Sequence, residues 1–309
     1  MHQIHHSRND VDNGASGDDR VETDLSRRRA IARLGGLLVA VHSARAYSAC
    51  DTSFSPRPEL EPNTFDEITR YNNYYEFSSN KEAVHVLAQS LTTDPWSVQI
   101  DGEVENPLLL DVDQIRQRFD VEERVHSLRC VEGWSKVVPW SGFPLCKLIK
   151  SARPLSHARF VQFESLYRPA EMIGQRTRNF PWPYTEALTL EEALHPLAFV
   201  ATGLYGRPLP KQNGAPLRLV MPWKYGFKSI KAITRIRLTR SRPETSWSKQ
   251  VPSEYGFFGN VNPTVAHPRW NQKREHRLGE LRKRKTVLFN GYADEVANLY
   301  QGLDLRRNF

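Results

Sequence analysis

The stretch VHSLRCVEGWSKVVPW, residues 125–140, places a cysteine at the end of a strand-like segment. Polar and apolar side chains alternate over residues 123–130, which is typical of a half-buried strand ending at Cys130. The chain has only two other cysteines, Cys50 and Cys146, so the three thiols cannot all pair and the sequence is no disulfide scaffold. At least one thiol is therefore free, buried or a ligand.

Three roles for Cys130 are open on these residues. It can be a small buried hydrophobe, the common fate of a free cysteine, or a nucleophile with a histidine base such as His126 or His195. It can also be a soft metal ligand. No CxxC, HExxH or histidine cluster accompanies it in the sequence. A metal site with one protein thiolate would therefore need a cofactor that brings the other ligands.

Composition favours a globular protein that binds an anion. Of the 309 residues, 39% are hydrophobic and 25% are charged, which is typical of a folded chain rather than a disordered one. The net charge of +8 suits an anionic cofactor, an acidic partner or a membrane surface, but it is too diffuse to indicate nucleic acid. The densest basic cluster, residues 271–285, is expected to be a solvated loop or helix face.

Apolar periodicity and turn residues predict short strands and short helices in irregular order. Strands are expected within 96–111, 123–130, 158–165, 196–203, 215–223 and 231–240, and helices within 64–77, 111–119, 143–152, 189–196 and 291–303. Asp111 and Thr189 are expected to cap two of the helices, and Cys146 to lie in the core. Without a repeat, a P-loop or a Gly-rich dinucleotide loop, this order predicts an α+β fold.

The N-terminus is predicted to be an export signal. Three consecutive arginines follow Ser26, a short apolar run occupies 34–41, and Ala44-Arg45-Ala46 resembles a cleavage site. Adjacent arginines favour the twin-arginine route, which carries folded proteins to the periplasm. We therefore expect a signal over 1–46, an extended segment over 47–63 and one folded domain over 64–309. No apolar run reaches the roughly 18–20 residues of a membrane span.

A second stretch, residues 210–231, concentrates amide, hydroxyl and basic side chains around aromatic residues. Asn213, Arg218 and Lys231 beside glycine backbone can hold a phosphate or another polar anion. Because residues 215–223 have the character of a core strand, a recessed pocket is favoured over a flat nucleic-acid surface.

These stretches together resemble the molybdopterin enzymes of the sulfite-oxidase fold, and among them the bacterial periplasmic protein-methionine-sulfoxide reductases. The segments that carry the resemblance are RYNNYYEF (70–77), RCVEGWSKVVPW (129–140), GFPL (142–145), HPLAF (195–199), PKQNGAPLRLVMPWKYGFKSIK (210–231), EYGFFGNVNP (254–263), HPRW (267–270) and LFNGYADEVANLYQGLDLRRNF (288–309). They follow one another in the family's order over residues 64–309, so the expected domain is a molybdopterin-binding catalytic domain.

The resemblance implies a Mo-molybdopterin cofactor with one mononuclear molybdenum centre whose protein ligand is Cys130. Glu132 is implied as a catalytic neighbour of the metal. The implied cofactor-binding residues are Asn72, Asn73, Tyr75, Glu76, Ser165, Asn213, Arg218, Ser229, Ile230 and Lys231. The chain departs from the family at Ser165, where threonine is usual, at Gly133, where alanine is usual, and in a shorter segment 176–184.

The resemblance also implies a reaction and partners. The enzyme would remove oxygen from methionine sulfoxide in oxidised proteins, using electrons from a haem-containing inner-membrane subunit and the quinone pool. It would associate with the membrane through that subunit. Trp223 and Tyr225 would either frame the substrate mouth or lie in the core. A sulfite dehydrogenase on the same fold and a non-catalytic periplasmic binding module are the alternatives.

Overall fold

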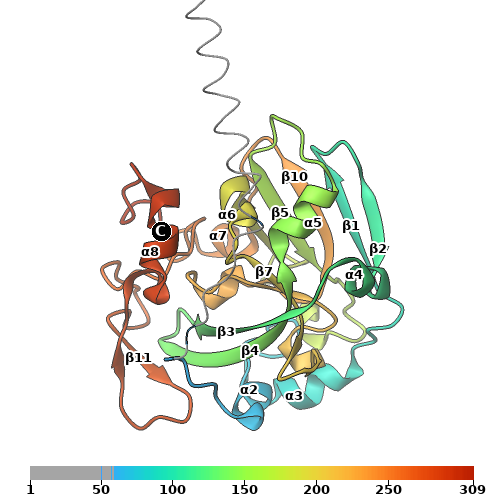
Figure 1. The fold of residues 1–309 in the computed structure, drawn as a ribbon. Helices are drawn as coiled ribbons and strands as arrows, with labels where there is room; N and C mark the ends of the chain where they lie inside the picture. Colours follow the sequence, from blue (N-terminus) through green and yellow to red (C-terminus); the bar gives the residue numbers. More distant parts are fainter. Residues whose placement is uncertain (1–49, 51–56, 58) are drawn as a thin grey trace, which may run out of the picture. The chain divides into compact units, whose positions relative to one another are not determined.

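The computed structural model describes residues 50, 57 and 59–309 (Figure 1). The predicted signal over 1–46 and most of the predicted extended segment over 47–63 lie outside the described residues. In the described part of the chain, no helix combines the length and apolar character needed to cross a bilayer.

The first sheet has five strands, and four of them fall within segments predicted to contain strands, whereas β6 was not predicted. Their order is β2 (Leu108–Asp111), β1 (Ser97–Gly102), β10 (Ile233–Thr239), β5 (Phe160–Ser165) and β6 (Thr185–Thr189). β1 and β10 are parallel, and the other neighbours are antiparallel. Every second residue of β5 is buried, because one face of the strand packs against the core and the other face is less buried.

The second sheet carries the predicted strand that ends at Cys130. Its main order is β12 (Arg284–Lys285), β11 (Arg274–Arg277), β4 (Trp134–Pro144), β7 (Phe199–Leu204) and β8 (Arg207–Pro208), while β3 (Glu122–Arg129) pairs with β4 and β9 (Arg218–Val220) pairs with β7. β3 and β4 form a long antiparallel pair in Figure 1. Ten of the eleven residues of β4 are buried, so this strand lacks the alternation that would have revealed it.

The helices are short, as predicted, and several of those described begin at capping boxes. The described α-helices are α2 (Phe65–Arg70), α3 (Val84–Leu87), α4 (Val112–Arg118), α5 (Leu145–Ser151), α6 (Leu190–Leu194), α7 (Ser246–Gln250) and α8 (Ala293–Val296). The described 3₁₀ segments are η2 (Ala88–Ser90), η3 (Ile173–Arg176), η4 (Lys211–Asn213), η5 (Gly226–Lys228), η6 (Leu288–Gly291) and η7 (Ala297–Tyr300). Thr64, Asp111 and Thr189 each accept a hydrogen bond from the third helical N–H, so the two predicted caps are confirmed.

Two predictions about the C-terminal part need correction. The basic cluster 271–285 is mostly exposed, as predicted, and includes a loop, but it is not a loop or a helix face throughout, because β11 and β12 pair in it as an antiparallel hairpin. The predicted helix over 291–303 is broken into α8 and η7, and neither exceeds four residues.

Cys146 lies on α5 and is fully buried, as predicted, and it forms a disulfide with Cys50. Cys130 is the free cysteine of the chain. The mixed sheets and short helices confirm the predicted α+β class.

Candidate active site

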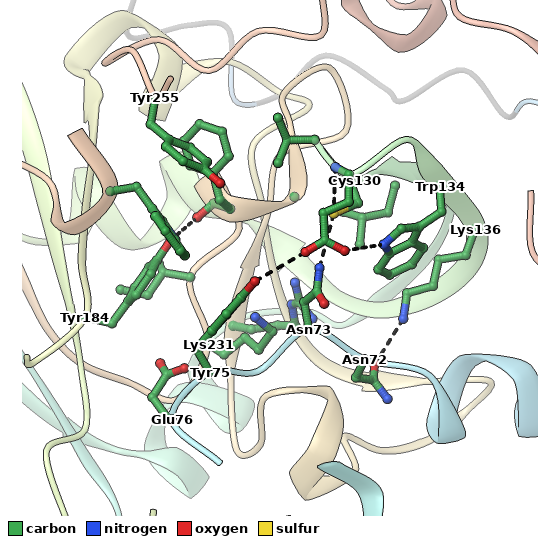
Figure 2. A pocket seen from close by; sticks show the side chains of 18 residues that line it. Asn72, Asn73, Tyr75, Glu76, Cys130, Trp134, Lys136, Tyr184, Lys231 and Tyr255 are labelled. Carbon is green, nitrogen blue, oxygen red and sulfur yellow. Dashed lines mark hydrogen bonds between the residues drawn. The ribbon is translucent and has the colours of Figure 1, made fainter. Parts of the chain in front are cut away.

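The turn after β3 opens onto a pocket of about 780 Å³, including its open mouth (Figure 2). Three segments supply most of its wall: the loop after α2, the β3–β4 turn, and the chain from β9 to Lys231. Nine of the twelve predicted site residues line it: Asn72, Asn73, Tyr75, Glu76, Cys130, Glu132, Arg218, Ile230 and Lys231. The structure therefore brings together residues that are distant in the sequence.

Cys130 is held in a tight turn between β3 and β4. Its backbone N–H donates to Trp134 O at 2.9 Å, and Gly133 N–H donates to Cys130 O at 3.1 Å. Gly133 has φ +87°, a left-handed conformation that favours glycine. The Cys130 sulfur points into the pocket and accepts hydrogen bonds from Asn73 Nδ2 at 3.2 Å and Glu132 N at 3.4 Å (Figure 2).

Burial and the nearby Glu132 carboxylate raise the pKa of the Cys130 thiol to about 12. The thiol is therefore protonated at neutral pH in the protein alone, and a thiolate forms readily only when a cation binds to the sulfur. This favours the metal-ligand role over the nucleophile role. Neither candidate base lines the pocket: His126 contacts Tyr292, and His195 contacts the backbone of Glu295.

The Cys130 turn is braced by a strand from the C-terminal part of the chain. Arg129 is fully buried and donates from Nε to Glu275 on β11 at 2.9 Å. The Arg129 guanidinium also bonds Cys130 O and donates to Gln272 Oε1 at 3.1 Å. Gln272 in turn donates to Val131 O at 2.6 Å. These contacts fix the backbone on both sides of the thiol, and the sequence did not indicate them.

The Glu132 carboxylate receives three donors at the rim of the pocket. Lys81 Nζ lies 2.8 Å from Oε2, Tyr75 Oη donates to Oε1 at 3.3 Å, and Trp134 Nε1 donates to Oε2 at 3.4 Å. The ion pair with Lys81 offsets the carboxylate charge next to the thiol. Lys81 and Trp134 were not among the predicted site residues.

Another part of the pocket wall is strongly cationic. Lys136, Arg218 and Lys231 lie close enough for their charges to repel, and Glu76 is the carboxylate that partly offsets them. Burial first, and then this repulsion, lower the pKa of Lys136 to about 7 and that of Lys231 to about 8. Burial also lowers the pKa of Arg218 to about 10.

Lys136 is the main site residue that sequence reasoning missed. Its ammonium donates to Asn72 Oδ1 at 3.0 Å and contacts the carbonyl of Tyr71 at 3.4 Å. Trp134 and Lys136 stand two residues apart on β4 and both line the pocket, as the period of a strand requires. Recognising β4 as a strand would have placed Lys136 beside Trp134 on this wall.

Three predicted residues lie behind the pocket wall. Ser229 is fully buried and braces it, because its hydroxyl accepts from Met221 N at 3.1 Å and its carbonyl accepts from Arg218 at 3.1 Å. Ser165 Oγ and Asn213 Oδ1 are both buried, and Asn213 Oδ1 has no hydrogen-bond partner among the described residues. The Ser165 hydroxyl lies beside Glu76 and opposes the rise that burial causes in the Glu76 pKa.

Of the two predicted places for Trp223 and Tyr225, the substrate mouth or the core, the structure shows the core. Trp223 and Tyr225 are buried, so they belong to the core, and Trp223 Nε1 donates to Tyr300 at 2.7 Å. The pocket is instead lined by Tyr75, Trp134, Tyr184, Phe227, Trp247 and Tyr255. Tyr75 meets Trp247 edge to face, and Trp247 stacks on Tyr255.

These residues fit a molybdopterin with its metal. The described residues contain no group of three or more His, Cys, Asp and Glu side chains placed to hold a metal ion, so a cofactor must bring further ligands to Cys130. The excess of buried cations over carboxylates suits an anionic phosphate and polar ring system. The unpartnered Asn213 Oδ1 offers a further polar contact beside it.

A match to a protein-family model agrees with this chemistry. Residues 85–247 match the family described as "Oxidoreductase molybdopterin binding domain". A solved structure, the sulfane dehydrogenase SoxCD from Paracoccus pantotrophus, is similar over 60% of this chain and 50% of that chain, with 16% identity and a TM-score of 0.42. The chain thus spans half the length of that protein.

The family match covers Cys130, Glu132, Ser165, Asn213, Arg218 and residues 229–231, whereas the loop 72–76 precedes it. It confirms the predicted sulfite-oxidase-type molybdopterin-binding fold and the Mo-molybdopterin cofactor, and it identifies an oxidoreductase. With more than half of its residues in the match, this chain belongs to the oxidoreductase molybdopterin-binding domain family.

Proposed function

We propose that the protein is a reductase that removes oxygen from methionine sulfoxide in exported proteins. The observation that carries this proposal is the polarity around the Cys130 sulfur. The sulfur contacts a neutral amide, Asn73, and a backbone N–H, and the nearest carboxylate is Glu132. A neutral sulfoxide meets no charge repulsion there, whereas sulfite, an anion, would approach a carboxylate whose partner Lys81 is already engaged.

The aromatic mouth supports the same substrate. Methionine and its sulfoxide are unbranched and flexible, and sulfur packs favourably against aromatic rings. Tyr75, Trp247 and Tyr255 form a contiguous aromatic group in the pocket wall. A methionine sulfoxide side chain on a protein surface can reach such a mouth without the whole residue entering the pocket.

The proposed reaction converts methionine sulfoxide, two electrons and two protons into methionine and water. The bound Mo-molybdopterin supplies the two-electron oxygen-transfer chemistry, and the protein supplies position and charge. Cys130 holds the metal through its sulfur, while Asn73 and the Glu132 N–H fix the orientation of that sulfur. Lys136, Arg218 and Lys231 offset the negative charge of the cofactor.

Export and the electron source belong to the same proposal. A buried disulfide between Cys50 and Cys146 is typical of an oxidising compartment, which supports twin-arginine export to the periplasm with a signal over 1–46. The catalytic domain would then be 64–309. Its electrons would come from a haem-containing inner-membrane subunit that draws on the quinone pool.

The second candidate is oxidation of sulfite or a related sulfur anion. The cationic wall of Lys136, Arg218 and Lys231 favours it, if those charges face the substrate rather than the cofactor.

A dye-linked assay on the purified molybdenum-loaded protein separates the two candidates. We expect reduced viologen dye to be oxidised with an oxidised methionine-rich protein, and little reduction of an acceptor dye with sulfite. Turnover of sulfite but not of methionine sulfoxide would refute the proposal. The Cys130→Ser variant is the control for activity without a correctly held metal.

A further inference from the structure

Residues 273–285, called the basic hairpin below, form the most strongly charged surface among the described residues that the active site does not use. They comprise β11, β12 and the loop between them, at the edge of the second sheet (Figure 1). Seven lysines and arginines stand against two glutamates in this segment. Because basic side chains repel one another, such a concentration favours an anionic partner.

Both glutamates of the basic hairpin are already engaged. Glu275 points inward to the buried Arg129, at 2.9 Å. Glu280 accepts from Arg284 within the hairpin, at 2.6 Å for the Nε–Oε2 pair. Five exposed cations form no ion pair with any described residue: Lys273, Arg274, Arg282, Lys283 and Lys285. Their charge is therefore available to a partner.

An apolar side chain stands among these charges. Leu281 is fully exposed in the loop of the basic hairpin and immediately precedes Arg282. Val287, just after β12, is also more than half exposed. A protruding leucine surrounded by basic residues can enter the boundary between lipid headgroups and acyl chains while the cations contact phosphates.

The shape of the basic hairpin favours a lipid surface over an acidic protein. A stable protein interface usually uses about 20–30 residues on each side, whereas the basic hairpin offers thirteen. A single exposed leucine would also need a matching pocket on a protein, but a bilayer accepts it anywhere. An anionic bilayer presents continuous negative charge, which suits five cations that form no ion pair with described residues.

The inner side of the basic hairpin contacts the metal-binding turn. β11 pairs with β4 at His276–Trp134 and Arg277–Ser135, and Trp134 lines the pocket. Docking through the basic hairpin would thus bring the wall of the active site near the partner surface.

We propose that the basic hairpin docks the protein directly on anionic phospholipid membranes, with Leu281 entering the lipid interface. The proposal does not depend on which sulfur compound the enzyme converts. It also places membrane contact in this chain itself rather than only in a partner subunit.

Co-sedimentation of the purified holoenzyme with vesicles tests the proposal. We expect binding to vesicles of phosphatidylglycerol and phosphatidylethanolamine, loss of binding in about 0.5 M salt because charges are then screened within roughly 4 Å, and little binding to phosphatidylcholine. Each basic residue near an anionic surface contributes about fivefold in partition. The combined variant Arg282→Gln, Lys283→Gln and Lys285→Gln should therefore bind about 100-fold more weakly.

Two further variants separate the hairpin from net charge. Arg118→Gln, Arg178→Gln and Arg240→Gln remove the same three charges from exposed positions elsewhere and should change binding by less than about fivefold. Leu281→Ser should weaken binding about tenfold without changing its salt dependence. Circular dichroism and dye-linked activity confirm that every variant is folded.

Equal binding of the two triple variants would overturn the proposal, because net charge alone would then explain the affinity. Failure of the wild-type protein to bind anionic vesicles at low salt would also overturn it. If that protein nevertheless bound poly-glutamate through Lys283 and Lys285, the basic hairpin would be assigned to an acidic protein partner instead.

Discussion

Replacing Lys136 with methionine removes a buried charge while nearly preserving the length of the side chain. Lys136 is 3% exposed, and burial together with repulsion from Arg218 and Lys231 lowers the pKa of its amine from 10.5 to about 7. This difference means that charging Lys136 in the folded protein costs on the order of 5 kcal/mol more than in water. Methionine has no charge to desolvate.

The direction in which Lys136 makes stability depend on pH follows from the protons bound by the folded and unfolded states. Between pH 7 and 10.5 the unfolded chain holds a proton on Lys136 that the folded cofactor-free protein lacks. This one group therefore makes stability rise with pH by about 1.4 kcal/mol per pH unit in that window. The stabilisation is complete above pH 10.5 and is lost as the pH falls to about 7.

Lys136→Met should remove this pH dependence and stabilise the cofactor-free protein at pH 7. The hydrogen bonds that Lys136 donates are lost, which reduces the gain. The loss is limited, because Asn213 Nδ2 still donates to two of the acceptors, Asn72 Oδ1 and Ile68 O, at 3.0 Å. Allowing about 1–3 kcal/mol for the lost contacts, we expect a net gain of about 2–4 kcal/mol. The loaded protein should show the opposite sign, with cofactor retention about 10–100-fold weaker because an anion loses a charged donor.

Urea unfolding of cofactor-free protein at pH 7.0 and 9.5 measures the first effect, and pterin fluorescence after dialysis measures the second. Lys249→Met, at an exposed lysine, is the matched control and should leave the pH slope unchanged. Equal slopes for the wild-type and Lys136→Met proteins, or a less stable variant at pH 7, would refute the reasoning.

Three other substitutions test separate parts of the site. Cys130→Ser should empty the site of molybdenum, while the melting temperature of the cofactor-free protein should stay within a few degrees of the wild-type value. Full metal content by elemental analysis would refute the assignment of Cys130 as the ligand. Glu275→Gln leaves the Arg129 charge buried without its carboxylate and should cost about 3–5 kcal/mol in urea unfolding, and a loss below 1 kcal/mol would show that the brace is unimportant. Lys81→Met leaves the Glu132 carboxylate without its counter-charge. Metal retention should be unchanged, while kcat for a neutral substrate should fall at least tenfold. An unchanged kcat would show that the Lys81–Glu132 pair has no role in catalysis.

Local chemistry made much of the fold predictable. The capping residues Asp111 and Thr189 and the alternation of β5 are signals contained within a few residues, and these three elements appear close to their expected places. β4 was missed because its few polar residues, such as the adjacent Ser135 and Lys136, do not alternate with apolar ones, and nearly all of the strand is buried on both faces. The basic cluster 271–285 was misjudged because pairing between β11 and β12 leaves no trace in charge composition.

The site was predictable where a motif surrounds the functional residue. Cys130 and the stretch 210–231 stand in distinctive surroundings, and resemblance to a family supplied the loop 72–76. Lys81 and Lys136 carry no such signal, because a lysine that is buried in the fold looks the same in sequence as one in solvent. Their positions depend on tertiary contacts with Glu132 and Asn72.

The brace between Arg129 and Glu275 has a consequence for the order of events during synthesis. These residues are 146 positions apart, so the turn that carries Cys130 leaves the ribosome long before β11 exists to support it. Metal capture by a nascent or truncated chain is thereby disfavoured, since the turn that carries the thiol is fully braced only when the C-terminal part has joined the second sheet. Cofactor loading then reports completion of the polypeptide, a useful checkpoint for a protein proposed to leave the cell interior already folded.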